Sequence, residues 1–121
     1  GMTGTVEIIP VNIALRDLII QVERGGISGV TSRSDVFMDD VHMTRLGNYY
    51  VACVVFSVVY GRTPEGATGL IPSPYSSQPP LLEIPASTAA ALQRQAWSTV
   101  SSYRGGTSTV RPKAPTSLQV R

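Results

Sequence analysis

The sequence predicts a small α/β domain that is mostly helical by content, with one strand and about three helices. Three observations predict it. A short apolar run rich in β-branched residues stands near the start, three longer segments repeat apolar residues at helical spacing, and glycines follow each of these segments. The chain has 121 residues, of which 42% are hydrophobic and 15% charged, so its size and composition suit one folded domain.

The first predicted unit is a strand, a tight turn and an amphipathic helix. Val6–Val11 (VEIIPV) is typical of a buried strand, and Pro10 marks its end or an edge. Asn12 is a suitable N-cap for the helix, and Gly25 with Gly26 stops it. One face of this helix is apolar and contains Leu15, Leu18, Ile19 and Val22. This arrangement is half of a βαβ repeat.

A loop over residues 27–43 precedes the second predicted helix. Thr44 can cap that helix, which runs to about Tyr60 with Gly61 as its stop. The stretch Val51–Tyr60 is apolar nearly all round, and its β-branched residues would also suit a strand. We favour the helix because the pattern is long and capped at both ends. A helix that is apolar on all sides must be covered on all sides.

The rest of the chain predicts an irregular crossing and a third helix. Arg62–Pro85 holds most of the prolines, and Ser87 or Thr88 can cap a helix that runs to about Tyr103 and ends at Gly105 and Gly106. Its apolar face contains Ala89, Leu92, Ala96, Val100 and Tyr103.

The ends of the chain predict flexible segments around one domain. Gly1 ahead of Met2 has the form of a scar from an expression tag. We expect residues 1–5 to be a tag scar and flexible start, residues 6–103 to form the domain, and residues 104–121 to be a flexible tail or linker.

Charge and composition exclude several classes of partner. The net charge is +2 and nine of the ten basic residues are scattered arginines, so we expect no nucleic-acid partner. The longest apolar stretch, Tyr49–Tyr60, is shorter than the roughly 20 residues that a bilayer needs, so we expect no membrane span. Cys53 is the only cysteine and stands in an apolar run, which indicates a buried hydrophobe. The compartment stays undecided.

The residues that could carry chemistry are Asp39, Asp40 and His42. A carboxylate three residues before a histidine can accept a hydrogen bond from one ring nitrogen and orient the imidazole. The other nitrogen can then take a proton from a serine hydroxyl. D-x-x-H spacing also arises often by chance, and a lone loop histidine is usually a polar surface residue. One histidine and two acids are too few ligands for a metal site, and we expect no cofactor.

The wider pattern resembles the closing segment of SGNH (GDSL-type) serine hydrolases. The matching pieces follow the order of that family: the strand Glu7–Val11, the block Asp35–His42, the helix start Leu46–Tyr49 and the terminal helix Leu92–Trp97. The resemblance implies the C-terminal part of a flavodoxin-like fold. It also implies that His42 is the general base, that Asp39 orients it, and that the complete protein hydrolyses esters, with acetylated carbohydrate as a candidate substrate. Asp40 has no role in that pattern.

The sequence departs from the family in lacking a nucleophile. The family's serine and its oxyanion donors come from blocks upstream of this segment, and none has a counterpart here. The turn around Ser28 superficially resembles a nucleophile elbow, but Val30 stands where glycine is needed and no strand precedes it. Ser57 lies inside the apolar helix and is expected to be packed. The chain is therefore interpreted as a partial hydrolase, inactive by itself, with a non-catalytic, self-associating remnant as the alternative.

An unpaired strand and an all-round apolar helix both need partners. A strand cannot satisfy its backbone N–H and C=O groups alone. We therefore expect a homo-oligomer, held together by antiparallel pairing of Val6–Val11 with its copy and by the apolar helix.

Overall fold

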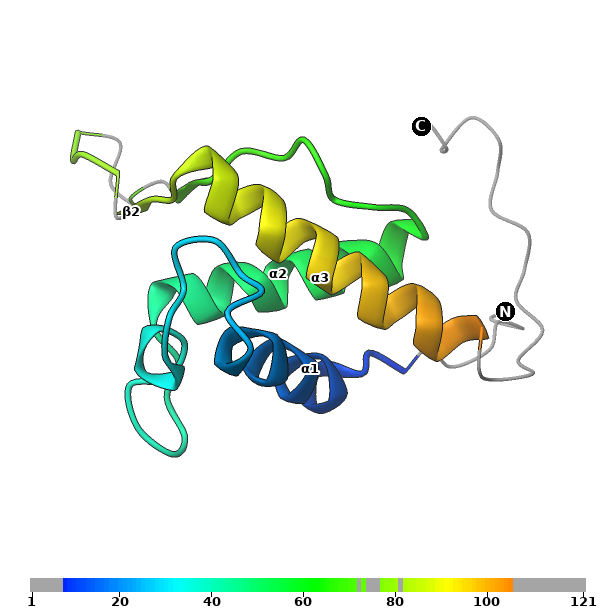
Figure 1. Cartoon of the computed structure of the whole chain (residues 1–121). Coiled ribbons are helices and arrows are strands. Elements are labelled where there is room, and N and C mark those ends of the chain that lie inside the picture. The colour runs from blue at the N-terminus through cyan, green and yellow to red at the C-terminus, as the bar shows by residue number, and fades with distance from the viewer. Residues whose placement is uncertain (1–7, 72, 74–76, 81, 106–121) are drawn as a thin grey trace.

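The computed structural model describes residues 8–71, 73, 77–80 and 82–105, and within them the chain is mostly helical, as predicted (Figure 1). Three α-helices, one short 3₁₀ turn and two two-residue strands follow one another along the described chain. In order they are α1 (Val11–Glu23), η1 (Arg33–Asp35), α2 (Arg45–Tyr60), β1 (Leu70–Ile71), β2 (Leu82–Glu83) and α3 (Ala86–Gly105). The two strands are antiparallel, with Leu70 opposite Glu83.

The predicted strand Val6–Val11 is not formed in the described part of the chain. Residues 8–10 have no strand structure, and Val11 already opens α1. Val6 and Glu7 lie outside the described residues. Ile8 is 65% exposed, and no described segment pairs with its backbone, which removes the ladder of hydrogen bonds that a strand requires. The segments predicted to be a flexible start, residues 1–5, and most of a flexible tail, residues 106–121 of 104–121, also lie outside the described residues.

Helix α1 matches its predicted pattern. Its core face buries Ala14, Leu18 and Val22, while Leu15 and Ile19 pack against the core at its margins. The helix ends as predicted. Gly25 has φ +74° and donates its N–H to the Val22 carbonyl, and Gly26 donates to the Gln21 carbonyl. These two bonds form a Schellman motif, which places the left-handed residue at a glycine.

Helix α2 is capped at both ends as predicted. The Thr44 hydroxyl accepts a hydrogen bond from the Gly47 N–H at 3.1 Å. Gly61 follows the last turn with φ +65°. The Arg104 guanidinium, from α3, donates to the carbonyls of Ser57 and Val58. A cation at this end satisfies carbonyls that the helix leaves open and complements its dipole.

Within a single chain, α2 is covered on only part of its circumference. Its inner face is buried, but Val59 is 61% exposed and Tyr60 is 53% exposed. The elements that pack most closely on α2 are α1 and α3. Two neighbouring helices cover only part of the circumference of a third, so the opposite side stays open to solvent within the part described.

Helix α3 begins at Ala86, ahead of the predicted caps. Pro85 instead supplies the first helical acceptor, because its carbonyl accepts from the Ala89 N–H at 2.9 Å. Thr88 is 3% exposed and packs against Gly29. A Cβ atom added at Gly29 would collide with the Thr88 hydroxyl. The predicted apolar face is confirmed, since four of its five members are buried: Ala89, Leu92, Ala96 and Val100.

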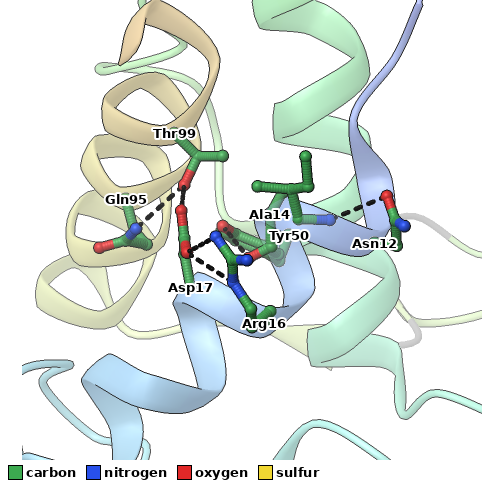
Figure 2. Close-up of polar contacts among 8 residues, drawn as sticks. Asn12, Ala14, Arg16, Asp17, Tyr50, Gln95 and Thr99 are labelled. Atoms are coloured by element: carbon green, nitrogen blue, oxygen red, sulfur yellow. Dashed lines mark hydrogen bonds and ion pairs between the residues drawn. The ribbon is translucent and has the colours of Figure 1, made fainter. Parts of the chain in front are cut away.

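Polar contacts join the three helices around Asp17 and Tyr50 (Figure 2). Oδ2 of Asp17 on α1 accepts from the hydroxyl of Thr99 on α3 at 2.9 Å. The Tyr50 hydroxyl on α2 donates to the Ala14 carbonyl on α1 at 2.8 Å. Burial raises the pKa of Tyr50, so this phenol stays neutral and keeps its donor. The contacts fix α1 against its two neighbours, and α2 in turn holds the loop that carries the candidate site.

Candidate active site

The loop before α2 folds back on itself as a narrow hairpin over residues 36–44, which we call the site hairpin. At its base the Thr44 N–H donates to the Val36 carbonyl at 2.8 Å. One step farther out, Phe37 and Met43 form an isolated antiparallel bridge. The hairpin therefore brings Asp39 and His42 to its tip.

At the tip, one carboxylate holds the turn and the imidazole together. Oδ1 of Asp39 accepts from the backbone N–H groups of Val41 and His42, both at 2.7 Å. Nδ1 of His42 lies 2.9 Å from Oδ2 of Asp39 and 3.1 Å from Oδ1. The Met38 N–H donates to the His42 carbonyl at 2.8 Å and closes the turn from the opposite side of the site hairpin. The two residues singled out from the sequence are thus brought into direct contact.

The same hydrogen bonds set the charge of Asp39. The backbone N–H groups of His42 and then Val41, followed by the His42 side chain, hold the pKa of the Asp39 carboxyl below its ordinary value. At neutral pH the group is an anion, and an anion facing Nδ1 favours the tautomer with its proton on that nitrogen. Nε2 then has a free lone pair, and no hydrogen bond to it is formed within the described part of the chain.

The pair lies in the open. The His42 side chain is 72% exposed and the Asp39 side chain 57%. Two surface hollows lie elsewhere and are lined by other residues: one of about 510 Å³ beside Gly66–Leu70 and the start of α3, and one of about 340 Å³ between α1 and Phe37. An exposed imidazole with an oriented Nδ1 can accept a proton, but these residues alone form no walled substrate pocket.

The base of the site hairpin is fixed to α2 by a buried side chain, a hydroxyl and a glycine. Val36 is fully buried in the core. The Thr44 hydroxyl donates to the Asp35 carbonyl at 2.7 Å while it caps α2. Gly47, in the first turn of α2, lies so close to the Val36 carbonyl that a Cβ atom would collide with it. The cap was predictable from the sequence, but the second bond of the Thr44 hydroxyl was not. A glycine in the first turn of a helix was the available signal for the close approach.

The serines considered as nucleophiles make other contacts. Ser28 lies in an exposed turn and shares a hydrogen bond with Ser87 at 3.3 Å. Ser57 is buried and donates to the Cys53 carbonyl at 2.8 Å, so the prediction that it is packed is confirmed. Neither hydroxyl bonds to His42 in the described structure.

The other candidate groups in the described residues are a thiol, a carboxylate and possible metal ligands. Cys53 is buried as predicted, and burial raises the pKa of its thiol to about 11. Asp40 is exposed, and the described chain gives it no hydrogen bond. Among the described residues no three His, Cys, Asp or Glu side chains gather where they could hold a metal ion.

Within the same described residues, no helix combines the length and the apolar character that crossing a bilayer would take.

Comparison with known proteins identifies no relative. No protein-family model matches the sequence, and neither the curated proteins nor the solved structures contain a match. The resemblance to SGNH hydrolases therefore stays a prediction from the sequence.

The hydrogen bonds to Asp39 predict how the tip responds to acid. Because the folded state lowers the pKa of this carboxyl, the group stabilises the turn above its ordinary pKa of about 3.9, and the contribution is lost as pH falls through the lower folded value. Carboxyl ¹³C NMR should show the Asp39 side chain titrating below its ordinary value. Titration at or above that value would mean that the turn is not formed in solution.

The close approach at Gly47 predicts an unusual response to alanine. Alanine is the better helix former by about 1 kcal/mol, so Gly47→Ala would stabilise an unconstrained helix. Here we expect the free energy of unfolding to fall by about 1–3 kcal/mol, because the new methyl group displaces the Val36 carbonyl. Urea denaturation measures the change, and an increase in stability would contradict the packing described.

Proposed function

We propose that this chain is the C-terminal part of an SGNH-type serine hydrolase and that it supplies the acid–base pair of the active site. His42 is the general base and Asp39 orients it. In this proposal the nucleophilic serine and the oxyanion donors come from a segment outside these 121 residues. The observation that carries the proposal is the 2.9 Å contact between Asp39 Oδ2 and His42 Nδ1, on an imidazole side chain that is 72% exposed.

The geometry suits proton transfer in ester hydrolysis. Nε2 of His42 takes the proton of the serine hydroxyl as its oxygen attacks the ester carbonyl, and the Asp39 anion stabilises the imidazolium that forms. The imidazolium then gives the proton to the departing alcohol, and the acyl-enzyme is cleared by water activated in the same way. An ester or an acetylated carbohydrate is the proposed substrate class.

The openness of the pair fits a site completed by another segment. In a complete serine hydrolase, the hydroxyl of the nucleophile lies within hydrogen-bond reach of the base. A His42 side chain that is 72% exposed leaves room for such a segment. By itself the pair has only water to activate, so we expect the isolated chain to hydrolyse esters no faster than free imidazole does.

A second candidate is a non-catalytic, self-associating remnant of a hydrolase. Two observations favour it: the hydrogen bonds of Asp39 already account for the turn without any catalytic role, and the outer side of α2 is apolar and open. In that case Asp39 would serve only as a turn residue of the site hairpin.

Ester hydrolysis by the complete gene product separates the two candidates. With p-nitrophenyl acetate, the proposal expects Asp39→Asn and His42→Ala each to lower kcat by about 10⁴-fold, because a triad works as a unit. Asp40→Asn is the matched control, since it removes a neighbouring carboxylate that makes no hydrogen bond in the described structure, and its activity should stay close to that of the parent.

Three outcomes would contradict the hydrolase proposal. They are a complete gene product without esterase activity, full activity in His42→Ala, and equal losses in Asp39→Asn and Asp40→Asn. Circular dichroism of each variant shows whether the fold is kept, so that a loss of activity can be assigned to the side chain.

A further inference from the structure

A surface hollow of about 340 Å³ lies between α1 and the base of the site hairpin, and we call it the α1 hollow. On one side it is lined by a stripe of α1 with helical spacing i, i+3, i+4, i+7 and i+8: Asn12, Leu15, Arg16, Ile19 and Ile20. On the other side it is lined by Arg33 of η1, which packs against α1, and by Phe37 of the site hairpin. Sites for small molecules commonly measure about 300–1,000 Å³, so the hollow is within their range.

Most of the lining of the α1 hollow is apolar. Leu15, Ile19 and Phe37 are half-buried and pack against the core, so each keeps part of its side chain open to the hollow. Ile20 adds an apolar side chain that is 37% exposed. An alkyl chain placed against these side chains would remove apolar surface of both partners from water. The apolar lining therefore suits an alkyl chain.

Among the described residues, the charged side chains that line the hollow are two arginines and no acid. Arg16 is partly neutralised, because its guanidinium donates to Oδ1 of Asp17 at 3.1 and 3.3 Å (Figure 2). Arg33 forms no ion pair within the described chain, and its guanidinium lies 5.0 Å from the centre of the Phe37 ring. Such a cation–π contact attracts the side chain to the ring without neutralising its charge.

The acid closest to Arg33 in the sequence is engaged by the backbone. Oδ2 of Asp35 accepts from the N–H groups of Thr31 and Ser32, at 2.9 and 3.2 Å. These bonds hold the Asp35 carboxylate at the start of the η1 turn, and it does not line the hollow. The α1 hollow therefore combines an apolar lining with an excess of positive charge.

We propose that the α1 hollow binds a single-chain amphiphile with an oxyanion head, the class of which octanoate is a simple member. The alkyl chain lies against Leu15, Ile19 and Phe37. The Arg33 guanidinium binds the head, because its planar fork can donate two parallel hydrogen bonds to one carboxylate. Charge complementarity thus selects the head of the ligand, and the apolar lining selects its tail.

The size of the hollow favours a small molecule over a protein partner. A stable protein interface takes about 20–30 residues on each side, whereas seven residues line this hollow. The proposal does not rest on the hydrolase function, because Asp39 and His42 do not line the hollow and binding is measured without an ester.

NMR titration with octanoate and three related compounds tests the ligand class. Sodium octanoate, below the concentration at which it forms micelles, should shift the backbone amide signals of residues 12–20 and 33–37 in ¹H–¹⁵N spectra. Octan-1-ol has the same tail without the charge, and butyrate has the same head with a shorter tail. Each should bind at least about tenfold more weakly than octanoate. Octyltrimethylammonium, which has a cationic head, should not shift these signals.

Substitutions test the two halves of the site separately. Arg33→Gln should weaken octanoate binding by about tenfold, because it removes the charged donor. Ile20→Ser should also weaken it, because it removes apolar surface. Arg94→Gln is the matched control and should bind octanoate as the parent chain does, since it removes the same charge from an exposed arginine of α3 outside the hollow. Arg16 is a poorer test, because its loss also frees Asp17.

Circular dichroism shows whether each variant is folded, so that a loss of binding can be assigned to the side chain. The proposal would be overturned by the absence of octanoate binding, by shifts that map to another surface, or by octan-1-ol binding as tightly as octanoate. Equal losses in Arg33→Gln and Arg94→Gln would also overturn it. So would binding to phosphatidylglycerol vesicles without binding of free octanoate, because the surface would then recognise a membrane and not a single chain.

Discussion

The attachment of the site hairpin to the start of α2 is the constraint on which the candidate site depends. Gly47 leaves room for the Val36 carbonyl, the Thr44 hydroxyl bonds to the Asp35 carbonyl, and the Val36 side chain is locked in the core. These three contacts hold the base of the hairpin on a rigid helix. The tip needs only the carboxylate of Asp39 to complete its turn. Side chains presented from a loop gain precision when the loop is fixed in this way.

Helix α2 has two different faces, and each supports one of the proposals. Its inner face and first turn organise the core and the hairpin, which leads to the Asp39–His42 pair. Its outer face, where Val59 and Tyr60 are exposed, is apolar, which supports the self-associating alternative. The two are independent, because the tip of the hairpin and the outer face share no residue. A dimer formed through α2 would leave the chemistry of His42 to be judged on its own evidence.

Local signals in the sequence predicted most of the helices, while features that depend on distant contacts were missed. Gly25 and Gly61 end helices because their positive φ values suit glycine, and Thr44 caps α2 through a bond three residues away. The strand at Val6–Val11 needed a partner from elsewhere, and propensity alone could not supply one. Thr88 was expected at a cap, but its packing against Gly29, far away in sequence, places it inside α3 instead. The contact of Asp39 with His42 was predictable because the two residues are only three apart.

The protonated nitrogen of His42 is the most direct test of the account. Free imidazole side chains favour the tautomer with the proton on Nε2, whereas a carboxylate at 2.9 Å from Nδ1 favours the proton on Nδ1. Long-range ¹H–¹⁵N NMR of the neutral side chain distinguishes the two forms. We expect Nδ1 to carry the proton and Nε2 to have the free lone pair. A neutral His42 with its proton on Nε2 would show that Asp39 does not orient the ring, and it would contradict the proposed role of His42 as the general base.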